Sequence, residues 1–174
     1  MNYAILNHWP RFGRVFRHLL SDRGAVRRVL PAPAMDAIAA AIAAGELRHD
    51  GEIRVCVEAG LPWSYLKRDA PARERALMLF SKLRVWDTER NTGVLVYLLV
   101  ADKSIEIVAD RGIARRVPQA TWTAICAALG RQLQQGQAEA GMLAAIQRIS
   151  DELAAHFPPL AQNNNELPDA PTVL

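Results

Sequence analysis

The sequence predicts an α/β fold, namely a three-layer α/β/α sandwich around a small mixed β-sheet. Three observations favour it. Residues 53–57 alternate in polarity, residues 94–100 form a nearly unbroken apolar run, and segments with helical apolar spacing lie between and after them. The length of 174 residues suits one domain with a single core.

The first expected element of this domain is an alanine-rich helix over residues 35–44. Gly45 follows it, in the position where glycine commonly terminates a helix. Residues 53–57 then place β-branched side chains on alternate positions, which predicts a strand. Residues 59–70 contain glycine, proline and aspartate, and we expect a loop there.

The second half of the domain begins with a helix that starts near Pro71, a residue tolerated in the first turn. The apolar run 94–100 predicts a strand covered on both faces. Residues 105–109 alternate in polarity after a short polar turn, so the two segments are expected to form a β-hairpin. A helix opening at Pro118 and a last helix ending before residues 158–159 complete the domain.

The chain therefore divides into three expected parts. Residues 1–34 form a basic amphipathic extension and a linker, residues 35–158 form the α/β/α domain, and residues 159–174 form a disordered tail. The tail is assigned from its polar, proline-containing composition.

The net charge of +3 is concentrated at the N-terminus, where residues 1–35 hold six arginines and one acid. The rest of the chain has a balance of −2, so no nucleic-acid partner is expected. Cys56 and Cys126 lie in apolar segments and read as buried, reduced thiols. No secretory signal or membrane-spanning run is recognisable, which predicts a cytoplasmic protein and leaves a peripheral membrane association open.

Residues 9–20 place apolar and basic side chains at helical spacing, which predicts an amphipathic basic helix. Two interpretations remain open. The helix either packs on the domain, or it contacts an anionic membrane surface or a protein partner, because cationic and apolar faces together suit that boundary.

The sequence contains no glycine-rich phosphate loop with lysine, and no GxSxG, HExxH or CxxC motif. Two segments next to the predicted hairpin still contain candidate functional residues. Asp110 and Arg111 follow its second strand, and Asp87 and Arg90 precede its first strand. An acid and several arginines at a strand end could hold a phosphate or a divalent cation. The alternative is a turn in which Asp110 forms a salt bridge with Arg111 or Arg90.

Three stretches carry a family resemblance: GEIRV at 51–55, LFSKLRVWDTERNTGVLVYL at 79–98 and IEIVADRGI at 105–113. They are similar to the TPM domain, and the later helices resemble that family's closing helices, so the likeness covers roughly residues 35–158. The resemblance implies an α/β/α sandwich, in agreement with the periodicity of the chain.

The resemblance also implies a set of functions. Some plant thylakoid members are associated with photosystem II repair and have been assigned a weak acid phosphatase activity, and some members bind calcium through acidic loop residues. Asp87 and Asp110 are the acids that best match family positions. The turn after the first strand, often Asp-Gly in the family, reads Glu58-Ala59-Gly60 here, and residues 117–119 lack a frequent aspartate.

Two functional hypotheses follow. The first is a non-catalytic binding module acting with a protein partner or at a membrane surface through residues 9–20. The second is a weak metal-assisted phosphomonoesterase, in which Asp87, Asp110 and Glu58 would hold a cation such as calcium. In that hypothesis, Arg90 or Arg111 would neutralise charge in the transition state, and a metal-bound water would attack.

Overall fold

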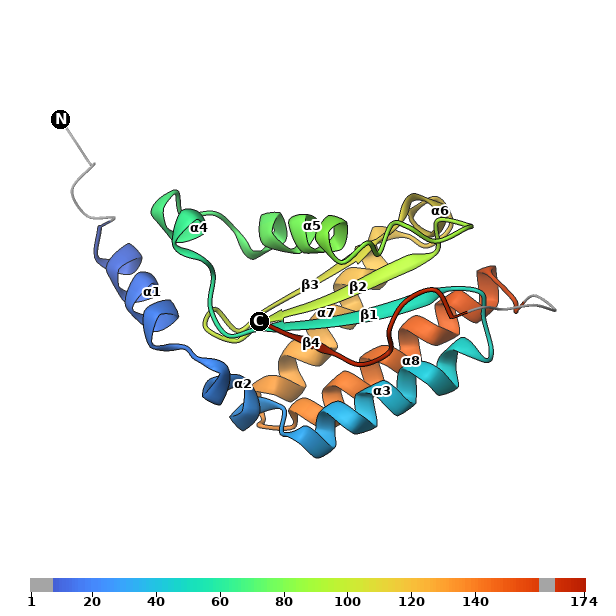
Figure 1. Cartoon of the computed structure of the whole chain (residues 1–174), viewed down its shortest axis with the longest axis horizontal. Helices are drawn as coiled ribbons and strands as arrows, with labels where there is room; N and C mark the ends of the chain where they lie inside the picture. Colours follow the sequence, from blue (N-terminus) through green and yellow to red (C-terminus); the bar gives the residue numbers. More distant parts are fainter. Residues whose placement is uncertain (1–7, 160–164) are drawn as a thin grey trace.

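The computed structural model describes residues 8–159 and 165–174, with side chains from residue 13 onward. It confirms the predicted fold class: helices cover both faces of a small open mixed sheet (Figure 1). The helices are α1 (His8–Leu20), α2 (Arg23–Val29), α3 (Ala32–Glu46), α4 (Trp63–Lys67), α5 (Ala72–Lys82), α6 (Arg111–Ala114), α7 (Gln119–Gln134) and α8 (Ala138–His156). The strands are β1 (Glu52–Glu58), β2 (Gly93–Leu99), β3 (Ser104–Ala109) and β4 (Thr172–Val173).

The strands lie in the order β3-β2-β1-β4. β1 is parallel to β2 and to β4, whereas β2 and β3 are antiparallel and form the predicted hairpin. Lys103 in the hairpin turn has a φ of 51°, a conformation that polar turns accommodate more readily than strands do. The register pairs Glu52 with Gly93 and Glu58 with Leu99, which fixes the two ends of the sheet.

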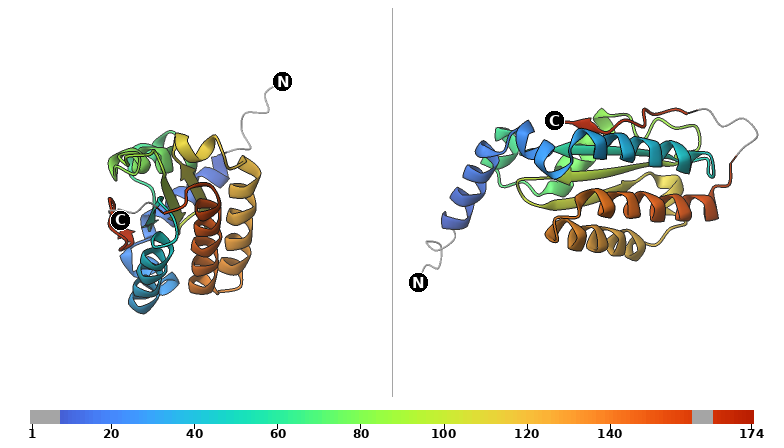
Figure 2. Two further views of the ribbon diagram at one scale, coloured as in Figure 1. Left: turned by 90° about the vertical axis from the view of Figure 1, so that its right-hand side faces the viewer. Right: turned by 90° about the horizontal axis from the view of Figure 1, so that it is seen from below.

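The two faces of the sheet have separate apolar cores. α3, α7 and α8 pack on one face, and α4 and α5 pack on the other (Figure 2). Along β2, alternate side chains belong to the two cores: Val94 and Val96 face the first, and Leu95 and Leu99 face the second. This double burial explains the unbroken apolar run seen in the sequence.

Helix α3 is longer than predicted, and Gly45 lies inside it rather than after it. A Cβ atom at Gly45 would collide with the Ser150 hydroxyl of α8. The glycine therefore allows the close packing of α3 on α8, and α3 ends at Glu46 with Leu47 as its C-cap.

The segment expected to be a linker is part of the fold. α2 occupies residues 23–29, and Val26 and Leu30 are each only 1% exposed in the first core. Asp22 caps α2 by accepting a hydrogen bond from the Ala25 N–H. A second short helix, α4, lies within the expected loop 59–70.

The expectation of a disordered tail is wrong for residues 165–174, and residues 160–164 lie outside the described part of the chain. Thr172 and Val173 pair with β1, and the Leu174 N–H donates to the Val57 carbonyl. Leu167 is buried in the second core. The tail is ordered because it satisfies the backbone groups on the free edge of β1.

Within the described residues, no single helix is long and apolar enough to cross a membrane. Taken together, α2 and α3 meet the same length and composition test, but a bend of 68° separates them.

Candidate functional site

The predicted site lies at the end of the sheet where β2 begins and β3 ends. Asp110 follows β3 and caps α6, with its Oδ1 atom accepting the Arg111 N–H at 2.6 Å. Its side chain is 8% exposed, and its Oδ2 atom has no hydrogen-bond partner within the described residues. A buried carboxylate oxygen in this state is costly and needs an explanation.

Gly112 brings α6 onto the loop that precedes β2. Its N–H donates to the Asn91 carbonyl at 3.1 Å. A Cβ atom at this position would come within 2.8 Å of the Arg90 carbonyl oxygen. The D-R-G-I stretch therefore needs glycine for close backbone approach. This contact places Asp110, Arg111 and Arg90 in neighbouring segments, as the sequence predicted.

The two guanidinium groups are engaged elsewhere. The Arg111 Nε atom donates to the Asn91 side-chain oxygen at 2.8 Å. Arg90 forms an ion pair with Asp50 at 2.8 Å and lies over the Phe157 ring, 6.0 Å from its centroid. No ion pair of the described residues joins Asp110 to Arg90 or Arg111, so the alternative of a salt-bridged turn at Asp110 is not observed.

The two other expected cation ligands do not join Asp110. Asp87 is in the loop before β2, but its side chain is half exposed and lies 3.9 Å from Arg84. Asp110 lies beside Gly93 at the start of β2, whereas Glu58 lies at the far end of the neighbouring strand β1. The rise along the strand separates these two ends of the sheet by roughly 20 Å. No group of three histidine, cysteine or acidic side chains in the described chain could hold a metal ion. The three-carboxylate site is therefore not formed, and these residues do not fit calcium, which takes six to eight oxygen ligands.

Glu58 instead forms a buried network beneath α5. Its carboxylate accepts from the Arg75 Nε atom at 2.9 Å and from the Tyr97 hydroxyl at 2.6 Å. Burial raises the pKa of Tyr97, and the adjacent Glu58 charge raises it further. Burial also raises the pKa of the neighbouring Cys56 thiol to about 12, which keeps the thiol neutral. The network is a buried ion pair whose carboxylate accepts hydrogen bonds from both Arg75 and Tyr97.

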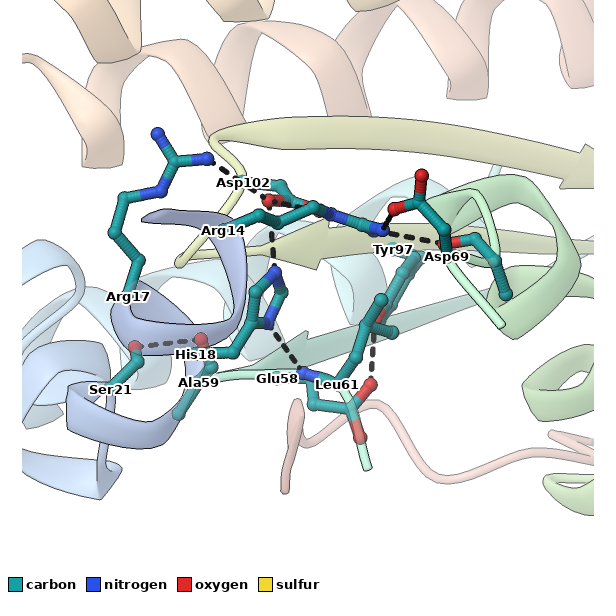
Figure 3. A network of polar contacts seen from close by, with 11 residues as sticks. Arg14, Arg17, His18, Ser21, Glu58, Ala59, Leu61, Asp69, Tyr97 and Asp102 are labelled. Carbon is teal, nitrogen blue, oxygen red and sulfur yellow. Dashed lines mark hydrogen bonds and ion pairs between the residues drawn. The ribbon is translucent and has the colours of Figure 1, made fainter. Parts of the chain in front are cut away.

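The same end of the sheet holds α1 through a second network, drawn in Figure 3. Arg14 donates to Asp102 in the hairpin turn at 2.8 Å and to Asp69 at 2.7 Å. His18 contacts Asp102 through Nε2 at 2.9 Å, and its Nδ1 atom accepts the Leu61 N–H at 2.8 Å. Since Nδ1 is an acceptor, Nε2 carries the proton and donates to Asp102.

The charges of this network reinforce one another. Burial acts to raise the pKa of Asp102, but hydrogen bonds from Arg14 and His18 outweigh burial and hold that pKa below its usual value. The hydrogen bonds that Arg14 donates to the Asp102 carboxylate raise the pKa of Arg14. Arg14 and His18 are four residues apart and so share one face of the helix. Their spacing was the available signal for this contact, but the sequence could not identify Asp102 as the partner.

Among the described side chains of α1, those on the opposite face are apolar and exposed. Phe16, Leu19 and Leu20 are 63%, 68% and 65% exposed. Their spacing of three and four residues places them side by side on the helix. We call these three residues the apolar face of α1.

Exposed arginines lie on α1 and on the helix that follows it, α2. Arg17 belongs to α1 and lies 3.7 Å from Asp102. Arg23, Arg27 and Arg28 are exposed on α2, and none of them takes part in an ion pair within the described residues. The region thus combines exposed apolar side chains with guanidinium groups that are available to an anion.

Comparisons with known proteins agree with this architecture. The family model described as TPM domain matches residues 27–152. A solved structure similar to this chain is the NMR structure of BA42 protein from the psychrophilic bacterium Bizionia argentinensis, with 30% sequence identity and a TM-score of 0.74. That likeness covers 83% of this chain and 95% of BA42. No curated protein matches the chain.

Proposed function

From the premise that this chain belongs to the TPM domain family, we propose that it is a non-catalytic binding module that docks on an anionic membrane surface through α1 and α2. The observation that carries the proposal is the apolar face of α1, exposed on a helix that Arg14 and His18 fix to the domain. Of the three carboxylates expected to hold a cation, Glu58 lies at the opposite end of the sheet from Asp87 and Asp110, which favours binding over hydrolysis.

The geometry of α1 suits insertion at a membrane interface. The side chains that hold the helix, Arg14 and His18, face the domain, so the apolar face remains available without any rearrangement. An interfacial helix buries such a face in the boundary between headgroups and acyl chains. A preformed helix avoids the entropic cost of folding at the surface.

The arginines supply attraction to anionic lipid. Arg17, Arg23, Arg27 and Arg28 are exposed on two consecutive helices. Each basic side chain near a negatively charged leaflet contributes about 1 kcal/mol, and salt screens this attraction. The proposal therefore requires binding that depends on anionic lipid and weakens with ionic strength.

The test is sedimentation of the full chain with vesicles of neutral phosphatidylcholine, with and without phosphatidylglycerol. We expect the wild type to sediment with the anionic vesicles at low salt. The double variant Leu19→Ser, Leu20→Ser should lose most of that binding, because it removes two of the three exposed apolar side chains.

Leu47→Ser is the matched control, since Leu47 is an 81% exposed leucine outside α1 and α2. Its vesicle binding should equal that of the wild type. Absence of wild-type binding to anionic vesicles, or full binding by the Leu19→Ser, Leu20→Ser variant, would rule the proposal out.

Phosphomonoester hydrolysis at Asp110 is the second candidate, supported by one observation. The buried Asp110 Oδ2 atom lacks a hydrogen-bond partner among the described residues and lies in a segment next to Arg90 and Arg111. The assay is turnover of p-nitrophenyl phosphate with and without calcium, in the wild type and in Asp110→Ala. Activity that survives this substitution unchanged would remove Asp110 from the candidate site.

A further inference from the structure

A groove separate from the apolar face of α1 runs between α2, the start of α3 and β4. Its volume is about 770 Å³, within the usual range of roughly 300–1,000 Å³ for small-molecule sites. Figure 1 shows α2 and α3 beside the C-terminal strand that completes it. The apolar side chains that line the groove come from all three segments: Val26, Leu30, Met35, Ala39 and Val173.

One wall of the groove is cationic. Arg23 and Arg27 both line it, and their spacing of four residues places them on the same face of α2. Neither forms an ion pair within the described part of the chain. Asp36 of α3 also lines the groove, and since its carboxylate repels an anion, the phosphate would be held at the α2 wall.

One end of the groove adds a further electrostatic feature. Pro31 and Ala32, at the N-terminus of α3, line it, and Pro31 provides no side-chain cap for that helix. The uncapped N-terminus carries a partial positive charge, which acts in the same direction as the two guanidinium groups.

We propose that this groove binds a single-chain alkyl phosphate, with the alkyl chain along the apolar floor and the phosphate held by Arg23 and Arg27. A free phosphate would not contact the apolar lining, and an uncharged alkyl chain would not use the two arginines. A ligand with both parts accounts for the composition of the groove, and guanidinium groups bind phosphate through paired hydrogen bonds. The site takes one ligand molecule in solution, and its lining includes none of the residues in the apolar face of α1.

The experiment is calorimetric titration of the full chain with dodecyl phosphate below its micelle concentration. Inorganic phosphate and dodecyl maltoside serve as the head-only and uncharged-chain probes. We expect dodecyl phosphate to bind at least tenfold more tightly than either probe. Arg27→Gln should weaken that binding about tenfold, and Ala39→Phe should abolish it by filling the groove.

Arg28→Gln is the matched control, because Arg28 is exposed on the same helix but lines a different hollow with Gly136 and Glu139. It should leave dodecyl phosphate affinity unchanged. The variant Leu19→Ser, Leu20→Ser should also keep full affinity, which separates this site from vesicle docking.

Equal affinities of Arg27→Gln and Arg28→Gln would overturn the proposal, as would full affinity in a folded Ala39→Phe protein. Arg27→Gln changes only an exposed side chain, so the test does not depend on Ala39→Phe folding. Loss of dodecyl phosphate binding in the Leu19→Ser, Leu20→Ser variant would equally overturn it, since the amphiphile would then be binding to α1.

Discussion

Both ends of the sheet bury carboxylate side chains, but different groups donate hydrogen bonds to the carboxylates at each end. Where β1 and β2 end, Glu58 pairs with Arg75, and Asp102 pairs with Arg14. Where they begin, Glu46 and Glu52 are buried and accept hydrogen bonds from backbone N–H groups. One end therefore neutralises its carboxylates with guanidinium groups, and the other uses mainly neutral donors.

This difference has a measurable electrostatic consequence. Hydrogen bonds from Arg14 and His18 overcome burial at Asp102 and hold its pKa low. Burial instead raises the pKa of Glu46 to about 8, and the neighbouring Glu52 and Asp169 charges act in the same direction. The paired end should contribute stability through its charges, whereas the other end should be more stable when it is protonated.

The largest expected effect is at the paired end. Glu58→Gln removes the carboxylate that neutralises Arg75, a side chain only 9% exposed. Breaking a buried ion pair on one side costs about 3–5 kcal/mol, because the remaining charge stays buried. Urea unfolding followed by circular dichroism measures the loss.

The double variant Glu58→Gln, Arg75→Met is the control for this prediction. Removing the second charge should recover part of the loss. A Glu58→Gln protein as stable as the wild type would show that this end does not depend on charge pairing.

The next largest loss of stability is expected where α1 is attached to the domain. Asp102→Asn removes the charge shared by Arg14 and His18, and hydrogen bonds to charged groups are worth about 1.5–3 kcal/mol. We expect faster amide hydrogen exchange in α1 and lower stability. Asp151→Asn is the control, because its ion pair with Arg48 is exposed and should contribute at most about 1 kcal/mol. Unchanged exchange in α1 would mean that other contacts hold the helix.

The sequence predicted the parts of this molecule that depend on local pattern. The period-2 apolar positions of β1 and the continuous apolar run of β2 are properties of short segments, and both strands appear as expected. The hairpin and the adjacency of Asp110 to Arg90 follow from the same local reading.

The sequence could not predict what depends on register and on distant partners. Glu58 was grouped with Asp110 because it occupies the turn after the first strand that is often Asp-Gly in the family, but parallel pairing of β1 and β2 puts the two residues at opposite ends of the sheet. The polar composition of residues 165–174 concealed β4, because a strand of two residues has no periodicity to detect. Gly45 was misread because only the position of α8 shows the close contact.

The end where the strands begin should show the opposite pH dependence to a salt bridge. The pKa of Glu46 is raised from 4.5 to about 8 on folding, so between these values the folded protein holds a proton that the unfolded chain has released. Stability should therefore fall as pH rises, by about 1.4 kcal/mol between pH 7 and 9. Urea titrations across this range measure the slope, and Glu46→Gln should flatten it.

His49 acts in a lower pH window and does not interfere. Burial lowers its pKa from 6.5 to about 4, so its contribution to stability rises with pH between these values and is complete near pH 7. A slope from pH 7 to 9 that persists in Glu46→Gln would assign the effect to another group.

The smallest effect is expected from Asp110→Asn, the counterpart of Glu58→Gln at the other end of the sheet. Asparagine caps a helix as well as aspartate, so the bond from the Arg111 N–H to the side chain is kept. The Oδ2 atom loses no hydrogen bond, because none reaches it from the described residues. Unfolding free energy should change by less than about 0.5 kcal/mol, because the substitution keeps the helix cap and removes no other hydrogen bond of the described residues. A loss above that, abolished by EDTA in the wild type, would show instead that a cation binds at Asp110 in solution.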